Sequence, residues 1–440
     1  MPLQECGINI KIITRPLLTC RYSYNDPVKT HLRKLLLALC LITTTVPAAA
    51  DDWREFRGPT GQGHAPNAHP PTQWNETENI RWKSEVPGRG WSSPVIAAGR
   101  LWITTSIEDS EGSSLRLLAY DTETGNQLTN SEVFRVEDSD APNPKNSLAS
   151  PTAVIDPNNE RVYVHFGAYG TAAVSIDGTI LWSTHFPYIS QHGNGGSPII
   201  YEDLLILSID GYDTAYVVAI DSKTGAERWR TIRSEPVSQA YSTPLLINTD
   251  SSAQLVSVAA FRTTAHNPLT GEELWSVSYR NGFSNVPRPV FGHGMIYLST
   301  GFQTPSLLAV RVDGSGDVTG SHIEWRLNRG APLTPSPILV ENKLYVVSDF
   351  GIATCVNALT GELHWQERVG GNHSASPIFA NEHIYFQNEE GITTVIKPGA
   401  EFEVVARNQL EGSMLASMAA VGSALYIRTE SHLYRIEETP

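Results

Sequence analysis

Several short segments of this 440-residue chain combine cationic, amide and aromatic residues that could bind a ligand. Arginine and lysine pair with carboxylates, and side-chain amides both donate and accept hydrogen bonds. A carboxylated ligand or an acidic peptide would suit such a set. The candidate binding residues are Arg89, Trp91, Asn143, Lys145, Asn146, His192, Asn194, Gln239, Tyr241, Asn285, Arg288, Asn372 and His373.

The sequence gives little support for a catalytic or metal site. His192 and His373 could form a metal pair, but the sequence does not place the third ligand that such a site needs. Residues 313–317 resemble a calcium loop, although the closing glutamate is missing. The Asp-Phe-Gly triplet at 349–351 has no other kinase motif around it. We therefore predict no catalytic residue and no metal site.

Cysteine chemistry is equally limited. Cys6, Cys20 and Cys40 lie within the first 50 residues, and Cys355 is the one cysteine that follows them. Cys355 falls in an expected strand at 352–357, where a buried structural thiol is expected. Without the first 50 residues, the chain would have no internal disulfide.

The elements that would position the candidate residues are repeats of about 45 residues. In three repeats an acid or amide and a Thr-Gly pair precede a tryptophan, as in Asp221, Thr224-Gly225 and Trp229. A shortened Asp-Gly copy precedes Trp182, and residues 121–125 repeat the turn without a tryptophan. Because Asp accepts local backbone hydrogen bonds and Gly tolerates positive φ, this phrase predicts a hairpin. The tryptophans that we expect to dock between repeats are Trp82, Trp182, Trp229, Trp275, Trp325 and Trp365.

A second phrase, Ser-Pro or Thr-Pro, opens each repeat at a position where proline costs no strand hydrogen bond. Its copies begin at Ser93, Ser150, Ser197, Thr243, Arg288, Ser336, Ser376 and the degenerate Ser417. Alternating apolar residues then predict four strands per repeat, for example at 199–201, 204–209, 216–220 and 228–232.

The eighth repeat has segments for three strands, at 414–421, 424–429 and 432–437, whereas residues 79–86 have the pattern of a fourth strand with its tryptophan. We therefore predict an all-β fold over residues 79–440. It is an eight-bladed β-propeller of four-stranded blades, closed by an N-terminal outer strand that completes the last blade. A seven-bladed ring is the alternative.

The first 50 residues read as a leader with a signal peptide. A basic patch at 31–34, an apolar run at 35–46 and small residues up to Ala50 predict cleavage after Ala50. Residues 1–27 could be a misassigned start, and residues 51–78 read as an extended arm. Because the apolar run is too short to span a bilayer, we expect an exported protein, periplasmic or extracellular, with no transmembrane span after cleavage.

Composition narrows the functional classes. Hydrophobic residues make up 40% of the chain and charged residues 18%, which excludes a mostly disordered chain and a multi-span membrane protein. The net charge of −14 would repel phosphate backbones, so we expect no nucleic-acid partner.

The repeats resemble the tryptophan-docking repeats of the pyrroloquinoline quinone (PQQ) propeller superfamily, over about residues 79–437. That superfamily contains quinoprotein alcohol dehydrogenases and the non-enzymatic BamB-type propellers of outer-membrane assembly. The segments Trp53–Pro59 and Leu425–Thr429 look like a bacterial exported subgroup of PQQ-like, BamB-like repeat proteins.

The resemblance implies two functions. The first is a non-enzymatic scaffold that binds a protein or peptide partner, BamB-like in architecture. The alternative is a PQQ- and calcium-dependent oxidoreductase. The chain lacks the adjacent cysteines of those enzymes, an aspartate that we can align to their catalytic one, and a Cys-x-x-Cys-His haem motif. We therefore favour a binding protein without a cofactor, with sugar or polymer binding left open.

Overall fold

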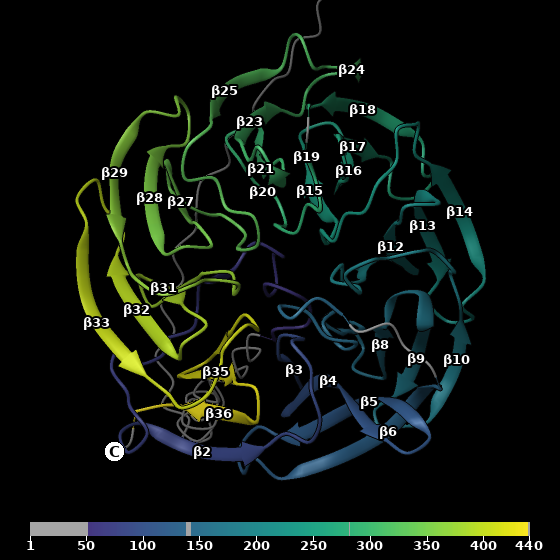
Figure 1. The fold of residues 1–440 in the computed structure, drawn as a ribbon, viewed down its shortest axis with the longest axis vertical. Coiled ribbons are helices and arrows are strands. Elements are labelled where there is room, and N and C mark those ends of the chain that lie inside the picture. The colour runs from purple at the N-terminus through teal and green to yellow at the C-terminus, as the bar shows by residue number, and fades with distance from the viewer. Residues whose placement is uncertain (1–51, 138–141, 281, 439–440) are drawn as a thin grey trace, which may run out of the picture. The chain divides into compact units, whose positions relative to one another are not determined.

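Eight four-stranded antiparallel sheets follow one another around a ring (Figure 1). The computed structural model describes residues 52–137, 142–280 and 282–438, so the predicted signal peptide lies outside the described residues. This arrangement confirms the predicted eight-bladed β-propeller. No helix in these described ranges is long and apolar enough to cross a membrane.

The four strands of each blade are called A, B, C and D from the innermost to the outermost. Blade 1 comprises β3 (Val95–Ala97), β4 (Arg100–Asp109), β5 (Gly112–Asp121) and β6 (Gln127–Val136). Blade 2 comprises β7 (Val154–Ile155), β8 (Arg161–His165), β9 (Thr171–Ser175) and β10 (Ile180–Thr184). Blade 3 comprises β11 (Ile199–Tyr201), β12 (Leu204–Asp210), β13 (Ala215–Asp221) and β14 (Glu227–Ile232). Blade 4 comprises β15 (Leu245–Asn248), β16 (Ala253–Val258), β17 (Arg262–His266) and β18 (Glu273–Ser278).

Blades 5 to 8 have the same order. Blade 5 comprises β20 (Val290–Gly292), β21 (Met295–Ser299), β23 (Leu307–Arg311) and β25 (Ile323–Leu327). Blade 6 comprises β26 (Ile338–Val340), β27 (Lys343–Val347), β28 (Ile352–Asn357) and β29 (Leu363–Arg368). Blade 7 comprises β30 (Ile378–Ala380), β31 (His383–Gln387), β32 (Ile392–Lys397) and β33 (Glu403–Gln409). Blade 8 comprises β34 (Ala419–Val421), β35 (Ala424–Arg428), β36 (His432–Ile436) and β2 (Ile80–Glu85). Short additions are β1 (His64–Ala65), β19 (Gly282–Phe283), β22 (Phe302–Gln303), β24 (Gly316–Asp317) and the 3-10 turn Gly167–Tyr169.

The ring closes through the pairing that the sequence predicted. Strand β2 pairs antiparallel with β36, so that Trp82 lies opposite Arg435 in the eighth sheet. One expected bound was wrong, because the inner strand of blade 8 begins at Ala419 and not at residue 414. The first and last blades are thus joined by backbone hydrogen bonds, which removes the free edge that an open ring would have.

The turns between strands C and D form as their local chemistry dictates. Asp221 Oδ1 accepts hydrogen bonds from the backbone N–H groups of Lys223 and Thr224 and from the Thr224 hydroxyl. Gly225 then adopts a φ of +74°, which glycine reaches without a Cβ clash.

Five of these turns, in blades 1, 3, 4, 6 and 7, also receive the tryptophan of the preceding blade. The indole N–H of Trp229 donates to the Pro268 carbonyl at 3.1 Å, and Gly271 lies directly against the ring. Trp82, Trp182 and Trp325 make the same bond to the next turn, and Trp365 donates to Gly399 O in the turn of blade 7. Trp275 differs, since its N–H donates to Gln254 within its own blade. Bulky indoles therefore fill the seams between neighbouring blades.

The segment of residues 52–79, here called the arm, runs along the inner strands of several blades. Trp53 bridges to Ile96 in blade 1, Arg54 bonds to the Asp156 carbonyl in blade 2, and β1 pairs with β30 in blade 7. Trp74 and Ala65 belong to one buried apolar cluster with residues of blade 8. The arm thereby links blades that are not neighbours in the sequence.

Candidate functional site

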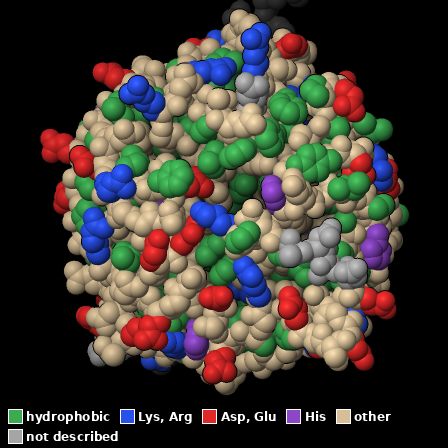
Figure 2. Space-filling model, viewed as in Figure 1, with side chains coloured by type: hydrophobic (Ala, Val, Ile, Leu, Met, Phe, Trp, Pro, Cys, Tyr) green, Lys and Arg blue, Asp and Glu red, His purple; other side chains and the backbone are tan. Residues whose placement is uncertain are grey.

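A cavity of about 840 Å³ lies at the centre of the ring. The D–A and B–C connections of several blades line it, and we call their side of the ring the loop face. Figure 2 shows a hollow near the middle of one face of the ring, with hydrophobic side chains around it and charged and histidine side chains among them. The size falls within the usual range for small-ligand pockets. We call this cavity the central pocket.

Hydroxyl side chains from the openings of the repeats surround the central pocket. The Thr152 hydroxyl accepts the Ser93 N–H, Ser197 accepts the Thr152 N–H, and Thr243 accepts the Ser197 N–H, at 2.9 to 3.0 Å. The same bond continues through Ser336, Ser376 and Ser417. We call these seven residues the hydroxyl ring. Its bonds tie the start of the inner strand to that of the next blade from blade 1 to blade 4 and from blade 5 to blade 8.

Arg288 takes the place of a hydroxyl residue in blade 5, and it interrupts this ring. Its buried guanidinium points to the arm, where it donates to the Phe56 carbonyl at 2.6 Å and to Glu55 at 3.0 Å. Phe56 itself lines the central pocket. Burial raises the pKa of Glu55, although the Arg288 charge opposes this shift. The arm therefore closes one part of the pocket wall through this ion pair.

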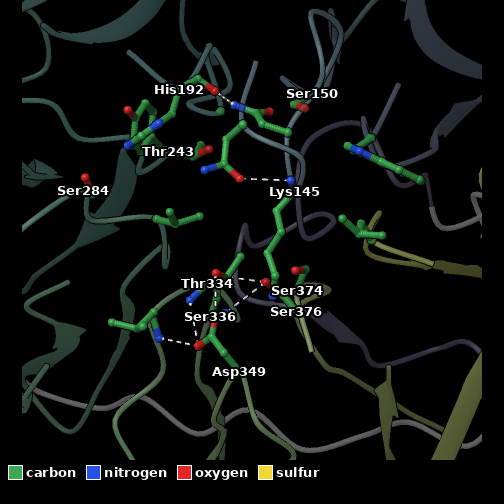
Figure 3. A pocket seen from close by; sticks show the side chains of 18 of the residues that line it. Lys145, Ser150, His192, Thr243, Ser284, Thr334, Ser336, Asp349, Ser374 and Ser376 are labelled. Carbon is green, nitrogen blue, oxygen red and sulfur yellow. Dashed lines mark hydrogen bonds between the residues drawn. The ribbon is translucent and has the colours of Figure 1, made fainter. Parts of the chain in front are cut away.

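The cation of the pocket wall is already paired. Lys145 crosses toward Ser374 in Figure 3, and its Nζ lies 2.7 Å from Glu389 Oε1. The same oxygen accepts the Ser374 hydroxyl at 2.6 Å. This contact joins the long D–A connection after blade 1 to the B–C turn of blade 7.

Asp349 is the carboxylate of the wall, and its oxygens are also occupied. It accepts the Leu333 N–H at 2.7 Å, the Thr334 N–H at 3.3 Å and the Thr334 hydroxyl at 2.7 Å. Figure 3 shows these bonds on one side of the pocket. Asp349 is therefore best described as a residue that holds two loops together.

Seven of the predicted binding residues line the central pocket. Gln239 and Tyr241 are hydrogen-bonded to each other at 2.6 Å, and the His192 ring packs 6.5 Å from the Tyr241 ring. Burial raises the pKa of Tyr241, so its hydroxyl keeps its proton. The seven are Trp91, Asn143, Lys145, Asn146, His192, Gln239 and Tyr241.

The other six predicted residues lie outside the lining. Arg89 donates to the Pro144 carbonyl on the loop face, and Arg288 faces the arm. Asn285 is fully buried, and His373 is buried with its Nε2 bonded to the Gly370 carbonyl. The remaining two are Asn194, against Gly167, and Asn372, whose N–H donates to Glu390. Their predicted role in binding stays a prediction.

The described residues do not place the two candidate histidines in one site. His192 lines the central pocket, whereas His373 does not. Within residues 52–137, 142–280 and 282–438, no group of three His, Cys, Asp or Glu side chains could hold a metal ion. Cys355 is buried in β28, where burial raises the pKa of its thiol to about 12. A neutral thiol is a poor nucleophile.

The pocket residues do not fit calcium-bound PQQ. A calcium site needs several oxygen ligands, and PQQ carries three carboxylates that need cations. The described lining offers Asp349 and Lys145 as its charged side chains, and each is bonded to a protein partner. We therefore derive no redox step at this pocket.

Sequence reasoning missed several lining residues. The residue of blade 2 in the hydroxyl ring is Thr152, two positions after the Ser-Pro phrase that we aligned at Ser150. Tyr212, Phe302 and Phe350 line the pocket from B–C turns. Aromatic residues at the same kind of turn in several repeats were the available signal, since exposed hydrophobic residues that gather on one face mark interaction sites.

The family profile described as outer membrane protein assembly factor BamB matches residues 72–260 and 259–413. The chain belongs to this family. Membership confirms the resemblance to PQQ-like propellers inferred from the tryptophan repeats. No curated protein sequence matches the chain at a significant level.

Solved structures similar to this member of the BamB family include a BamB protein and two alcohol-oxidising enzymes. BamB from Moraxella catarrhalis has a TM-score of 0.59 at 13% identity, over 82% of this chain and 97% of that one. A europium-containing methanol dehydrogenase has a TM-score of 0.57 at 11% identity, over 88% and 91%. A quinohemoprotein alcohol dehydrogenase from Pseudomonas putida has 0.56 at 10%, over 88% and 80%. At these identities the likeness concerns the fold alone.

Proposed function

We propose that this chain is an exported, non-enzymatic β-propeller that binds a protein or peptide partner through its loop face. The observation that carries the proposal is a group of exposed hydrophobic side chains around the central pocket. Phe350 is 71% exposed, Ile189 61%, Phe302 51% and Tyr212 44%. We call these four residues the rim cluster.

The rim cluster has the chemistry of a protein interface. Exposed hydrophobic side chains gathered on one surface mark interaction sites, and aromatic residues are enriched at the cores of such sites. Phe302 also packs edge-on against Phe283 at 5.7 Å, which holds its ring in place. Placement outside the cytoplasm, after cleavage at Ala50, accords with a role like that of the BamB proteins that the family is named for.

Site-specific photo-crosslinking tests the proposal. A benzophenone amino acid at position 350 should trap a discrete protein partner in the exported fraction of the native cell. Leu359 is the matched control position, because it lies in the same blade, is 50% exposed and belongs to the C–D turn on the opposite side. Equal capture at positions 350 and 359 would contradict a partner-specific loop face.

An assay of the alternative function belongs beside this experiment. The purified full chain, titrated with PQQ and calcium, should show neither saturable heat nor dye-linked alcohol oxidation. Turnover under these conditions would replace the proposed binding function with an oxidoreductase.

A further inference from the structure

We propose that the central pocket, at whose wall Tyr212, Phe302 and Phe350 of the rim cluster also lie, binds a neutral carbohydrate. The inference goes beyond the proposed function and does not rest on it. It depends on three properties of the described lining: its charges are internally paired, its hydroxyl groups keep hydrogen-bonding capacity, and aromatic rings stand among them.

Paired charges argue for an uncharged ligand. Lys145 is paired with Glu389, and Asp349 already accepts hydrogen bonds from two N–H groups and a hydroxyl. An anion would have to displace Glu389 from Lys145, and a cation would have to compete for oxygens that already accept hydrogen bonds. Both exchanges cost free energy that a neutral ligand avoids, although the cost is modest for a pair as exposed as Lys145–Glu389.

Unused hydroxyl groups argue for a ligand rich in hydrogen-bonding groups. Thr152, Ser197 and Thr243 each use one lone pair to accept a backbone N–H, and no described residue accepts their O–H groups. Ser93 Oγ has no hydrogen-bond partner among the described residues, although it lines the pocket. A hydroxyl can donate and accept at once, which is what another hydroxyl needs from its partner.

The walls between these hydroxyls are aromatic and amide in character. Trp91, Tyr241 and Phe283 present ring surfaces, and Asn143 and Gln191 present amide groups. A sugar ring combines an apolar C–H face, which packs on aromatic rings, with hydroxyls at its edge, which bond to amides and hydroxyls. A cavity of about 840 Å³ has room for more than one sugar residue.

Binding of neutral trisaccharides to the purified full chain tests this inference. The probes are maltotriose, cellotriose and the N-acetylglucosamine trimer, measured by calorimetry and by saturation-transfer NMR at millimolar concentrations. Tri-galacturonic acid is the charged counterpart. We expect at least one neutral trisaccharide to bind, and to bind more tightly than the charged one.

The variant Ser93→Ala tests whether the sugar binds in the central pocket. Because Ser93 Oγ bonds to no described residue, its loss should leave the fold intact and weaken sugar binding about threefold to tenfold. The matched control is Ser423→Ala, an exposed serine of the A–B turn in blade 8. Unchanged affinity in Ser93→Ala would overturn the assignment to this pocket.

Other outcomes separate this inference from the proposed function. Tighter binding of the charged trisaccharide would overturn the neutral-ligand inference. Absence of binding to all three neutral sugars would also overturn it, while partner capture at position 350 would leave the protein-binding function intact. Conversely, sugar binding without partner capture would retain this inference and remove the proposed function.

Discussion

The indole ring of Trp229 in blade 3 lies so close to Gly271 in blade 4 that a Cβ at Gly271 would come within 2.5 Å of Trp229 Cε3. A residue of one repeat thus fits only against glycine in the next. This contact couples the blades, because a change on either side of the seam disturbs the packing of the other.

Removal of the Trp229 indole should destabilise the propeller. We expect Trp229→Ala to lower the free energy of unfolding by about 3–5 kcal/mol, since the indole is buried and its loss leaves a cavity. Chemical denaturation measures the effect. Trp229→Phe should cost less, and an unchanged unfolding curve for Trp229→Ala would contradict the seam role.

Substitution of Gly271 tests the same contact from the side of blade 4, and Gly294 provides a matched control. Gly271→Ala should destabilise more than Gly294→Ala, because Gly294 has a similar positive φ but no atom within 4 Å of its would-be Cβ. Gly294→Ala should cost only the backbone strain, about 1–2 kcal/mol. Equal losses in the two variants would show that the Trp229 contact adds nothing to that strain.

A buried histidine should make stability depend on pH. Burial lowers the pKa of His165 from its ordinary 6.5 to about 3, so the unfolded chain binds this proton more readily than the folded one. The contribution of His165 is therefore complete above pH 6.5 and falls by about 1.4 kcal/mol per pH unit as the pH drops toward 3.

The variant His165→Gln isolates this effect from other acid-sensitive groups. Between pH 6.5 and 4, its free energy of unfolding should fall less steeply than that of the parent chain. Parallel curves for His165→Gln and the parent would refute the buried neutral histidine.

The attachment of the arm to the blades should depend on Arg288. Arg288→Met removes the hydrogen bonds to Phe56 and Glu55 and leaves the Glu55 carboxylate without its cation, at a cost of about 3–5 kcal/mol. We expect faster hydrogen exchange in residues 53–65 and little change in the outer strands. Arg228→Met, whose side chain is 47% exposed, is the control. Unchanged exchange in the arm would contradict the pinning role.

The sequence by itself determined the repeat architecture. The Asp221 turn and the Trp229 contact recur because hairpin hydrogen bonds and indole packing are local or involve adjacent repeats, so each leaves a periodic pattern. The same pattern located the strand at β2 that completes blade 8. Fold and ring closure were therefore predictable from spacing alone.

Only the tertiary structure decided which polar residues share a pocket. His192 and His373 occupy equivalent repeat positions, yet the first lines the cavity and the second bonds to its own loop. Arg288 follows the Ser-Pro pattern in sequence but reaches Phe56, 232 residues away, in place of a ring hydroxyl. Loop lengths and contacts with the arm set these positions, and such long-range contacts leave no periodic trace in the sequence.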